Sequence, residues 1–375
     1  MAEVKTPAQT PVCPESVNKL TASNLGPQRT ANPSLPFVSI VTPVHNEAEH
    51  LAECIESVLA QTYQNWDYTI VDNCSTDGST EIANRYAEKD RRIRVSRNHE
   101  LLPIIRNHNA ALRRISDSSK YCKIVFADDF IFPECIDRMV AVAEDHPSVG
   151  IVSAYSLVGE EIKCVGLPYQ TTAANGREVC RKHWLERRYL WGSANTLLYR
   201  SDLVRKYDPF YNEENIHADD EVCFLLLKTC DFGFVHQVLT FTRVRKDSMT
   251  TLSSDMHTEC ASTLHNLITH GSSFLAPEEL KSRIEQHLTL YYRALGKNLL
   301  LGRDKSFWNY HKQMLTQVDG GFNRMRVVGG AITVLGDAAL NIKDTLGKLR
   351  KTREKPSSTQ RNAELYERVP PDQTG

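Results

Sequence analysis

Residues 36–79 constrain the fold more than any other part of the chain. Two short apolar runs, residues 37–41 and 68–71, each end in polar groups, and one amphipathic helical stretch lies between them. A strand, a helix and a second strand in this order are typical of an open parallel sheet, in which ligands bind beyond the carboxyl ends of the strands. The segment therefore predicts a ligand site and leaves the ligand open.

The alternation of strands and helices continues after this segment. Residues 93–95, 123–127 and 149–154 are predicted strands, and residues 103–115 are a predicted helix. Such alternation favours a mainly parallel sheet that helices cover on both faces. Residues 232–241 also have the pattern of a strand, which we expect to pair in the antiparallel direction.

Composition divides the 375-residue chain into four parts. We expect a flexible tail over residues 1–35, an α/β domain over residues 36–250, a helical region over residues 251–350 and a second flexible tail over residues 351–375. Both tails are rich in polar residues and proline and show no apolar period. The length suits one large domain with an appendage.

Charge and cysteine usage narrow the class of protein. The formal net charge of −1 creates no global field that would attract nucleic acid or an anionic membrane. None of the ten cysteines forms a C-x-x-C pair, so the common zinc and redox motifs are absent from the sequence. We see neither a signal peptide nor an apolar stretch of about 18 residues. We therefore expect a cytoplasmic protein with free thiols, peripheral to a membrane if it contacts one.

Three groups of carboxylates lie at predicted element ends. Asp72 ends the second strand, where it could accept hydrogen bonds from a base or a ribose, although a turn-forming role is the alternative. Asp128 and Asp129 follow a buried strand, and two adjacent carboxylates favour a hard divalent cation or, otherwise, a solvated loop. Asp219 and Asp220 open a helix, which suits a general base and equally a helix N-terminus that the macrodipole stabilises.

Basic and aromatic residues complete the candidate set. Arg106 could neutralise phosphate charge, and its alternative is a surface ion pair. Gly192 would allow close approach of a ligand before a predicted strand. Trp191 could stack on a sugar ring, or could be an aromatic residue packed in the core.

Taken in chain order, these segments resemble the motifs of the family 2 glycosyltransferases, which have the GT-A fold. The matching segments are VSIVTPVHNE, IVDNCSTDGS, IRNHNAAL, VFADDF, WGSANTLLYR, HADDEVCFLL and TRVRKDSMT. The resemblance covers about residues 37–250. It implies a Rossmann-like α/β domain with a mixed, mainly parallel sheet flanked by helices, followed here by a C-terminal helical extension.

The resemblance also implies an activity. A sugar would move, usually with inversion, from a nucleotide-diphosphate sugar to an acceptor hydroxyl during synthesis of a cell-envelope or exported glycan. A UDP-sugar is the leading donor, a glycan or a lipid-linked molecule is the acceptor, and no nucleic acid takes part. Asp220, with Asp219, would be the base, Trp191 would contact the acceptor, and Asp128 and Asp129 would bind Mn²⁺ or Mg²⁺. The donor-binding residues would be Pro43, Glu47, Asp72, Arg106, Asp128, Gly192, Ser193 and Arg245.

Two positions depart from the family pattern. Phe126 occupies the place of the first Asp of the metal motif, and Arg245 occupies the place of a His that often lies near the metal. The loss of a carboxylate and the gain of a cation weaken the expected metal site, and Arg245 could offset diphosphate charge directly. The alternative function is therefore a catalytically inactive nucleotide-sugar-binding or scaffold protein. A dinucleotide-dependent oxidoreductase is disfavoured because the first strand lacks a G-x-G-x-x-G turn.

The predicted helix over residues 325–351 mixes apolar residues with flanking Arg and Lys. Such a helix could lie on an anionic membrane surface, as a peripheral contact. It could equally pack on the catalytic domain or on a second subunit. The sequence decides neither its neighbour nor the oligomeric state.

Overall fold

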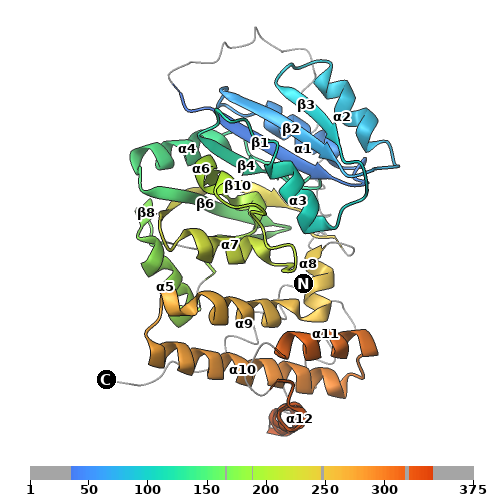
Figure 1. The fold of residues 1–375 in the computed structure, drawn as a ribbon, viewed down its shortest axis with the longest axis vertical. Helices are drawn as coiled ribbons and strands as arrows, with labels where there is room; N and C mark the ends of the chain where they lie inside the picture. The colour runs from blue at the N-terminus through green and yellow to red at the C-terminus, as the bar shows by residue number, and fades with distance from the viewer. Residues whose placement is uncertain (1–34, 165–166, 188, 246–248, 317–320, 341–375) are drawn as a thin grey trace, which may run out of the picture.

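The computed structural model describes residues 35–164, 167–187, 189–245, 249–316 and 321–340. The two predicted tails lie outside the described residues, apart from Leu35, and so does the end of the helix predicted over residues 325–351. Figure 1 shows an α/β domain in the upper part of the molecule and a stack of helices, α8 to α12, in the lower part.

One ten-stranded sheet forms the centre of the α/β domain. Its strands follow the order β3-β2-β1-β4-β9-β6-β10-β5, and the short β7 and β8 pair with β6 and β10. Strands β3, β2, β1 and β4 run parallel, and β9 is antiparallel to both β4 and β6. The predicted mainly parallel sheet is confirmed. The strands are β1 (Val38–Val44), β2 (Trp66–Asp72), β3 (Ile93–Arg97), β4 (Tyr121–Ile124), β5 (Phe130–Ile131), β6 (Val149–Val158), β7 (Glu161–Lys163), β8 (Ala173–Ala174), β9 (Leu198–Arg200) and β10 (Asp231–Thr242).

The pairing of β10 departs from the expectation. We expected this strand to be antiparallel, but it runs parallel to β6 along most of its length and is antiparallel only to the short β5 and β8. An apolar run shows that a strand is buried, but it carries no information on the direction of its neighbour. The direction is therefore decided by the tertiary structure.

Helices cover both faces of the sheet, because alternate residues of a strand point to opposite faces. Ile40 of β1 belongs to a core cluster with α1 and α4, whereas the next residue, Val41, belongs to a second cluster with α3 and α7. The helices of this domain are α1 (Leu51–Leu59), α2 (Ser79–Ala87), α3 (Ile104–Leu112), α4 (Cys135–Asp145), α5 (Gly176–Glu186), α6 (Ser201–Arg205) and α7 (Ala218–Leu226).

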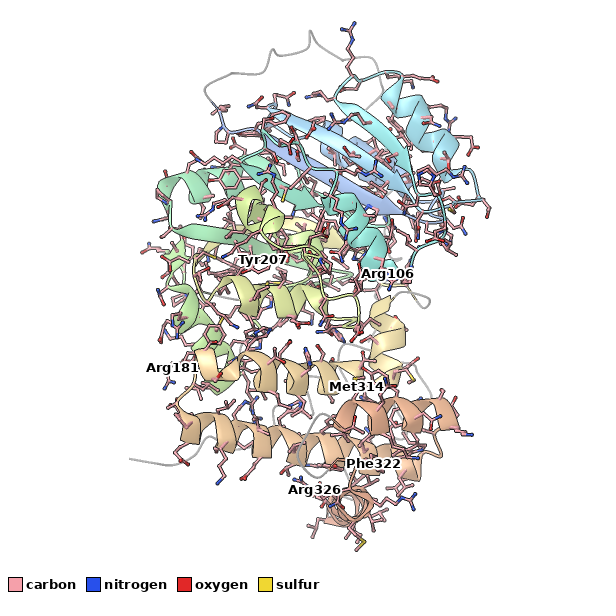
Figure 2. The ribbon with its side chains drawn as sticks, in the orientation of Figure 1. Arg106, Arg181, Tyr207, Met314, Phe322 and Arg326 are labelled. Carbon is pink, nitrogen blue, oxygen red and sulfur yellow. The ribbon has the colours of Figure 1, made fainter. Side chains whose placement is uncertain are left out.

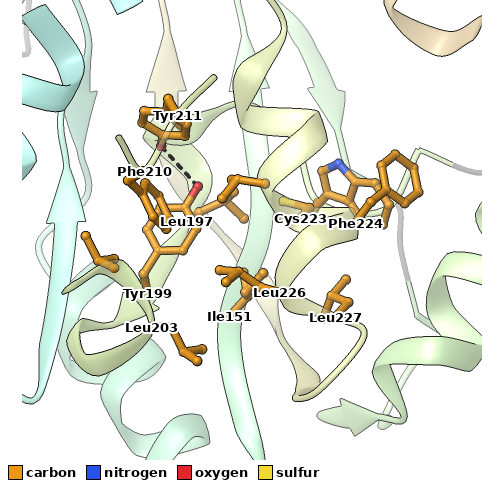
Figure 3. Packing of buried hydrophobic residues seen from close by; sticks show 14 of the residues in the cluster. Ile151, Leu197, Tyr199, Leu203, Phe210, Tyr211, Cys223, Phe224, Leu226 and Leu227 are labelled. Carbon is orange, nitrogen blue, oxygen red and sulfur yellow. Dashed lines mark hydrogen bonds between the residues drawn. The ribbon is translucent and has the colours of Figure 1, made fainter. Parts of the chain in front are cut away.

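Helix α7 is anchored through its apolar side. Figure 3 shows Cys223 and Leu226 of α7 in the same buried cluster as Ile151 of β6. Beside them the hydroxyl groups of Tyr199 and Tyr211 lie 3.2 Å apart and share a hydrogen bond. This packing fixes the direction of α7 and therefore the position of its N-terminus, where the predicted catalytic acids lie.

The C-terminal helices have a core cluster of their own and also contact the α/β domain. Arg181 of α5 forms an ion pair with Glu279 of α10, and Arg181 is labelled in Figure 2. His217, which precedes α7, lies 3.0 Å from the hydroxyl of Thr258 in α9. These helices are α8 (Met249–Met256), α9 (Thr258–His270), α10 (Pro277–Leu300), α11 (Lys305–Leu315) and α12 (Arg324–Leu340).

No helix in the described part of the chain is long and apolar enough to cross a membrane. The nine cysteines within the described residues are free, and most of them are buried. Cys74 is partly exposed, has a positive φ of 60° and directs its thiol toward the carbonyl oxygen of Asn98 at 3.5 Å.

Candidate active site

The loops that follow β1 and β2 are joined by backbone-to-side-chain hydrogen bonds. The amide of Asn46 donates to Ser75 Oγ at 3.0 Å, and the amide of Glu47 donates to Ser79 Oγ at 2.9 Å. The amide of Ala48 donates to the Asp77 carboxylate at 2.8 Å. The polar residues that end the two strands therefore form one continuous rim at the carboxyl edge of the sheet, where parallel sheets bind ligands.

Asp72 lies in this rim, at the end of β2 and opposite Val44 in the strand register. Its side chain has no exposed surface. Oδ1 accepts a hydrogen bond from the amide of Ser75 at 3.1 Å, and Oδ2 lies 3.3 Å from Nε of Arg97. Pro43 is buried within β1, one residue before Val44. Arg97 is the cation paired with the Asp72 carboxylate. Because Asp72 has no exposed surface, a nucleoside would reach this carboxylate only after a covering side chain moves.

Arg245 joins the ends of three strands. Its Nη1 and Nη2 each donate to the Glu47 carboxylate at 2.7 Å, and Nη2 also lies 3.3 Å from Oδ2 of Asp128. Glu47 follows β1, Asp128 follows β4, and Arg245 follows β10. The structure thus brings together three predicted donor-binding residues that are distant in the sequence.

Asp129, the second predicted metal ligand, is directed into the protein. It is buried, and its Oδ1 accepts a hydrogen bond from the amide of Arg243 at 2.9 Å. Burial and the adjacent Asp128 carboxylate raise the pKa of Asp129 to about 8. Asp129 therefore holds the end of β10 in place.

The residues present do not fit a divalent cation. Phe126, at the place of a further carboxylate, packs on the ring of His108 at 4.9 Å between centroids. Asp128 and Glu47 already share the guanidinium of Arg245. Within the described residues, no group of three His, Cys, Asp or Glu side chains is arranged to hold a metal ion. As they stand, Asp128 paired with Arg245 and Asp129 turned inward do not present two carboxylates to one cation, which was the expected arrangement.

Asp219 and Asp220 begin α7 and are held by the loop around residues 191–196. The amide of Ala194 donates to Asp219 at 3.2 Å, and the indole Nε1 of Trp191 donates to Asp220 at 2.8 Å. Burial raises the pKa of Asp220 to about 7, and the Asp219 carboxylate adds to this effect. A carboxyl group with such a pKa can accept a proton near neutral pH.

Trp191 does not have the exposed position expected of a sugar-stacking residue. Its side chain is 0% exposed, and its ring stacks on His183 at 4.6 Å between centroids. The structural alternative, a packed aromatic residue, describes it better, with the added role of orienting Asp220. We therefore correct the expected sugar contact of Trp191, because the His183 side chain stacks on its ring.

Gly192 is required by the protein rather than by a ligand. Its φ is +77°, and a Cβ at this position would lie 2.4 Å from the Cys164 thiol and 2.5 Å from Thr196 Oγ1. The next residue, Ser193, is partly exposed, and its carbonyl accepts a hydrogen bond from the Thr196 amide at 2.8 Å. Ser193 thus remains a candidate donor contact, whereas Gly192 shapes the loop that carries it.

Arg106 lies on α3, where Figure 2 labels it, and pairs with Glu213 at 2.8 Å. This is the surface ion pair that we gave as the alternative to a phosphate contact for Arg106. Sequence reasoning missed Arg97 and Arg243, which contact Asp72 and the pair Asp128 and Asp129. Arg97 ends the strand next to the one that Asp72 ends, and Arg243 lies two residues before Arg245. Their positions beside predicted site residues could therefore have identified both arginines as candidates.

Comparison with known proteins decides the family resemblance. Residues 39–206 match the model of the glycosyl transferase family 2. The resemblance to family 2 is confirmed. An uncharacterized glycosyltransferase of Haemophilus influenzae is 24% identical over 49% of this chain and 58% of its own length. TuaG of Bacillus subtilis, named provisionally as a teichuronic acid biosynthesis glycosyltransferase, is 29% identical over 34% of this chain and 49% of its own length.

A solved structure shares the fold. TarS residues 1–349 of S. aureus, in complex with UDP-GlcNAc, aligns with a TM-score of 0.55 and 17% identity, covering 74% of this chain and 80% of that one. The GT-A fold expected from the sequence is thus confirmed. The chain spans only about half the length of the two glycosyltransferase relatives above, 58% and 49%.

Proposed function

We propose that this protein is a glycosyltransferase that moves a sugar from a nucleotide-diphosphate sugar to an acceptor hydroxyl, with Asp220 as the general base. The observation that carries the proposal is the environment of Asp220. The carboxyl group is partly buried at the start of α7, has a pKa raised to about 7 and is oriented by the Trp191 indole. Perturbed carboxyl groups oriented by a second residue are typical of catalytic acids and bases.

The proposed reaction is a direct displacement. Asp220 takes the proton of the acceptor hydroxyl while the hydroxyl oxygen attacks the anomeric carbon of the donor. The bond from that carbon to the diphosphate oxygen breaks with inversion, and the nucleoside diphosphate leaves. Asp219 accepts a hydrogen bond from the Ala194 amide and so holds the start of α7 against the loop around residues 191–196. Because the residues do not fit a divalent cation, no step uses one.

The donor would lie along the rim that β1, β2 and β4 form. Pro43 and Asp72 would hold the nucleoside once the side chain that covers Asp72 moves, Arg245 with Glu47 and Asp128 would face the diphosphate, and Ser193 would lie near the donor. A UDP-sugar is the leading donor, since the solved TarS structures contain UDP and UDP-GlcNAc. The name of TuaG supports a cell-envelope or exported glycan as the product.

A paired substitution tests the activity. Wild type is screened for transfer and for hydrolysis with UDP- and GDP-sugars, and Asp220→Asn is compared with Asp137→Asn, an exposed acid in the first turn of α4. We expect Asp220→Asn to lower turnover by about a hundredfold or more while donor affinity is retained. Asp137→Asn should behave as wild type. Equal turnover in both variants would refute Asp220 as the base.

A nucleotide-sugar-binding protein without activity is the second candidate. Phe126 and the inward-facing Asp129 favour it, because both remove carboxylates that the family motif provides. This candidate predicts a raised melting temperature with nucleotide sugars, since ligand binding to the folded state stabilises it. It also predicts no transfer or hydrolysis with any donor.

We further propose that the outer side of α12 is a peripheral contact to an anionic membrane. Val327 and Ala331 face the protein, whereas Met325, Val328, Ile332 and Leu335 are 44% to 77% exposed. These four residues recur at helical spacing and form one apolar stripe. Residues 341–355 of the sequence, directly after this helix, contain six Lys or Arg and two acidic residues. Apolar residues followed by basic ones favour anionic lipid.

Vesicle sedimentation tests this contact. We expect the protein to bind vesicles containing phosphatidylserine more strongly than neutral vesicles. Ile332→Glu should abolish the difference, and Ile162→Glu, at an exposed position on β7, should preserve it. A concentration-dependent dimer that only Ile332→Glu disrupts would refute the membrane contact and assign the stripe to a second copy.

A further inference from the structure

The edge of the sheet contains a fixed cation where three strand ends converge. The Arg245 guanidinium donates to both carboxylate oxygens of Glu47 at 2.7 Å, and Asp128 lies 3.3 Å away on the other side. All three side chains are partly buried, so their orientation is restrained by the protein. A guanidinium held at two oxygens keeps a single orientation, unlike a free surface arginine.

The carboxylates near this cation are already engaged. Asp129 accepts from the amide of Arg243, and the backbone oxygen of Asp128 accepts from the side chain of Arg243 at 3.0 Å. Arg243 is paired in turn with Glu53 of α1. A second arginine therefore ties the loop after β4 to the end of β10. A metal ion in this place would have to displace one guanidinium and turn Asp129 out of its buried position.

We infer that Arg245 supplies the positive charge for the donor diphosphate in this protein and that nucleoside diphosphate binding needs no divalent cation. The inference rests on the proposed function, because it concerns the same donor site. A guanidinium is charged at every accessible pH and its planar fork matches phosphate oxygens. Glu47 and Asp128 act as positioning residues, since they hold the guanidinium before the ligand arrives. Preorganisation of this kind reduces the cost of ordering a long side chain on binding.

The charge at the site also sets a condition on the ligand. Arg245 contacts two carboxylates, so a diphosphate competes with them for the same N–H groups. A ligand with several phosphate oxygens can offer more acceptors than either carboxylate alone. We therefore expect a nucleoside diphosphate to bind much more tightly than the corresponding monophosphate, with or without metal.

Calorimetric titration with UDP and GDP tests the inference, in EDTA and in Mn²⁺. For wild type, we expect dissociation constants that agree within about twofold in the two buffers. Arg245→Ala should weaken binding about tenfold or more in EDTA, as loss of a charge-assisted hydrogen bond does. The matched control is Arg113→Ala, which removes an exposed guanidinium that is paired with Asp208 at the C-terminal end of α3. The control should bind as wild type does.

A third variant separates the charge of Arg245 from the metal. Arg245→His places a neutral nitrogen ligand beside Glu47 and Asp128, a set that can take a divalent cation. We expect nucleotide binding by this variant to be strengthened by Mn²⁺, unlike binding by wild type.

The outcomes distinguish the inference from the proposed function. Wild-type binding that appears only with Mn²⁺, or an Arg245→Ala variant that binds as tightly as wild type, would overturn the role of Arg245 and leave the glycosyltransferase proposal intact. Wild type that binds neither nucleotide in either buffer would refute the donor site itself. Unfolding midpoints of the variants, measured in parallel, exclude loss of the fold as the cause.

Discussion

Asp220 illustrates how one residue takes its reactivity from its surroundings. Partial burial at the start of α7 disfavours ionisation of its carboxyl group, and the neighbouring Asp219 carboxylate makes ionisation less favourable still. The Trp191 indole opposes these effects by donating a hydrogen bond to the ionised form. The balance leaves the pKa of Asp220 near 7, where the group can both accept and release a proton.

The pH dependence of transfer follows from this pKa. Below pH about 7 the Asp220 carboxyl is protonated and cannot accept the acceptor proton, so kcat/KM should fall about tenfold for each further pH unit. Rates measured between acidic and alkaline pH, at constant ionic strength, check the profile. A flat profile through neutrality would contradict the role of Asp220.

The raised pKa of Asp220 also predicts that substitution of Asp220 by asparagine stabilises the folded protein. A raised pKa means that the folded state binds more protons than the unfolded state, so stability falls as pH rises from about 4 to about 7. Asp220→Asn should remove this loss and raise the unfolding midpoint at pH 8, with a smaller gain at pH 4. Denaturation in urea at both values measures it. An unchanged midpoint at pH 8 would show that Asp220 is not destabilised by burial.

At the scale of elements, helix α7 is held by α9 through Glu221. His265 of α9 lies 3.3 Å from the Glu221 carboxylate, and the Asn212 and Asn215 side chains donate to it at 2.8 to 3.2 Å. Burial opposes ionisation of Glu221, but these hydrogen bonds outweigh it and lower its pKa well below the ordinary value. The C-terminal helices thus support the helix that carries the proposed base.

Removal of the Glu221 charge should lower the stability of the folded protein. A lowered pKa stabilises the folded state above the unfolded pKa, and the stabilisation is lost as pH falls below about 4. Glu221→Gln should cost about 1–3 kcal/mol at pH 7 and much less in acid. Urea unfolding at the two pH values measures it, with the exposed Glu278→Gln of α10 as control. An equal loss at both pH values would refute the ionic contribution.

At the scale of the whole molecule, two glycines decide how closely the last helices pack. A Cβ on Gly330 of α12 would lie 2.3 Å from the Tyr292 carbonyl of α10, and one on Gly296 would lie 2.2 Å from the Ala331 amide. The neighbouring Gly329 has open space around its Cα. The crossing of α10 and α12 thus depends on one glycine of an adjacent pair.

The adjacent pair makes a matched test. Gly330→Ala should force the helices apart and lower stability by about 1–3 kcal/mol, as overpacking does. Gly329→Ala should stabilise α12 by up to about 1 kcal/mol, because alanine is the better helix former. Thermal unfolding and limited proteolysis of the C-terminal helices compare the two variants. Equal behaviour of both would contradict the close crossing.

The sequence alone predicted the alternating strands and helices, the mainly parallel sheet and the position of Asp72, because burial periodicity and strand-end polarity are local properties. Its motifs also indicated the resemblance to the family 2 glycosyltransferases, which the comparison with known proteins confirmed. The parallel pairing of β10 could not be predicted, nor could the sequence choose between the sugar-contact and core roles of Trp191, because both depend on residues far away in the chain.

The tertiary structure alone decided which charges meet. Glu47 and Arg245 are separated by almost the whole α/β domain in sequence, and only the convergence of strand ends places them 2.7 Å apart. Asp128 and Asp129 look equivalent in the sequence, yet one meets Arg245 and the other is buried against the Arg243 amide. Residue type determines which chemistry is available, whereas long-range packing sets the charge, burial and direction of each group.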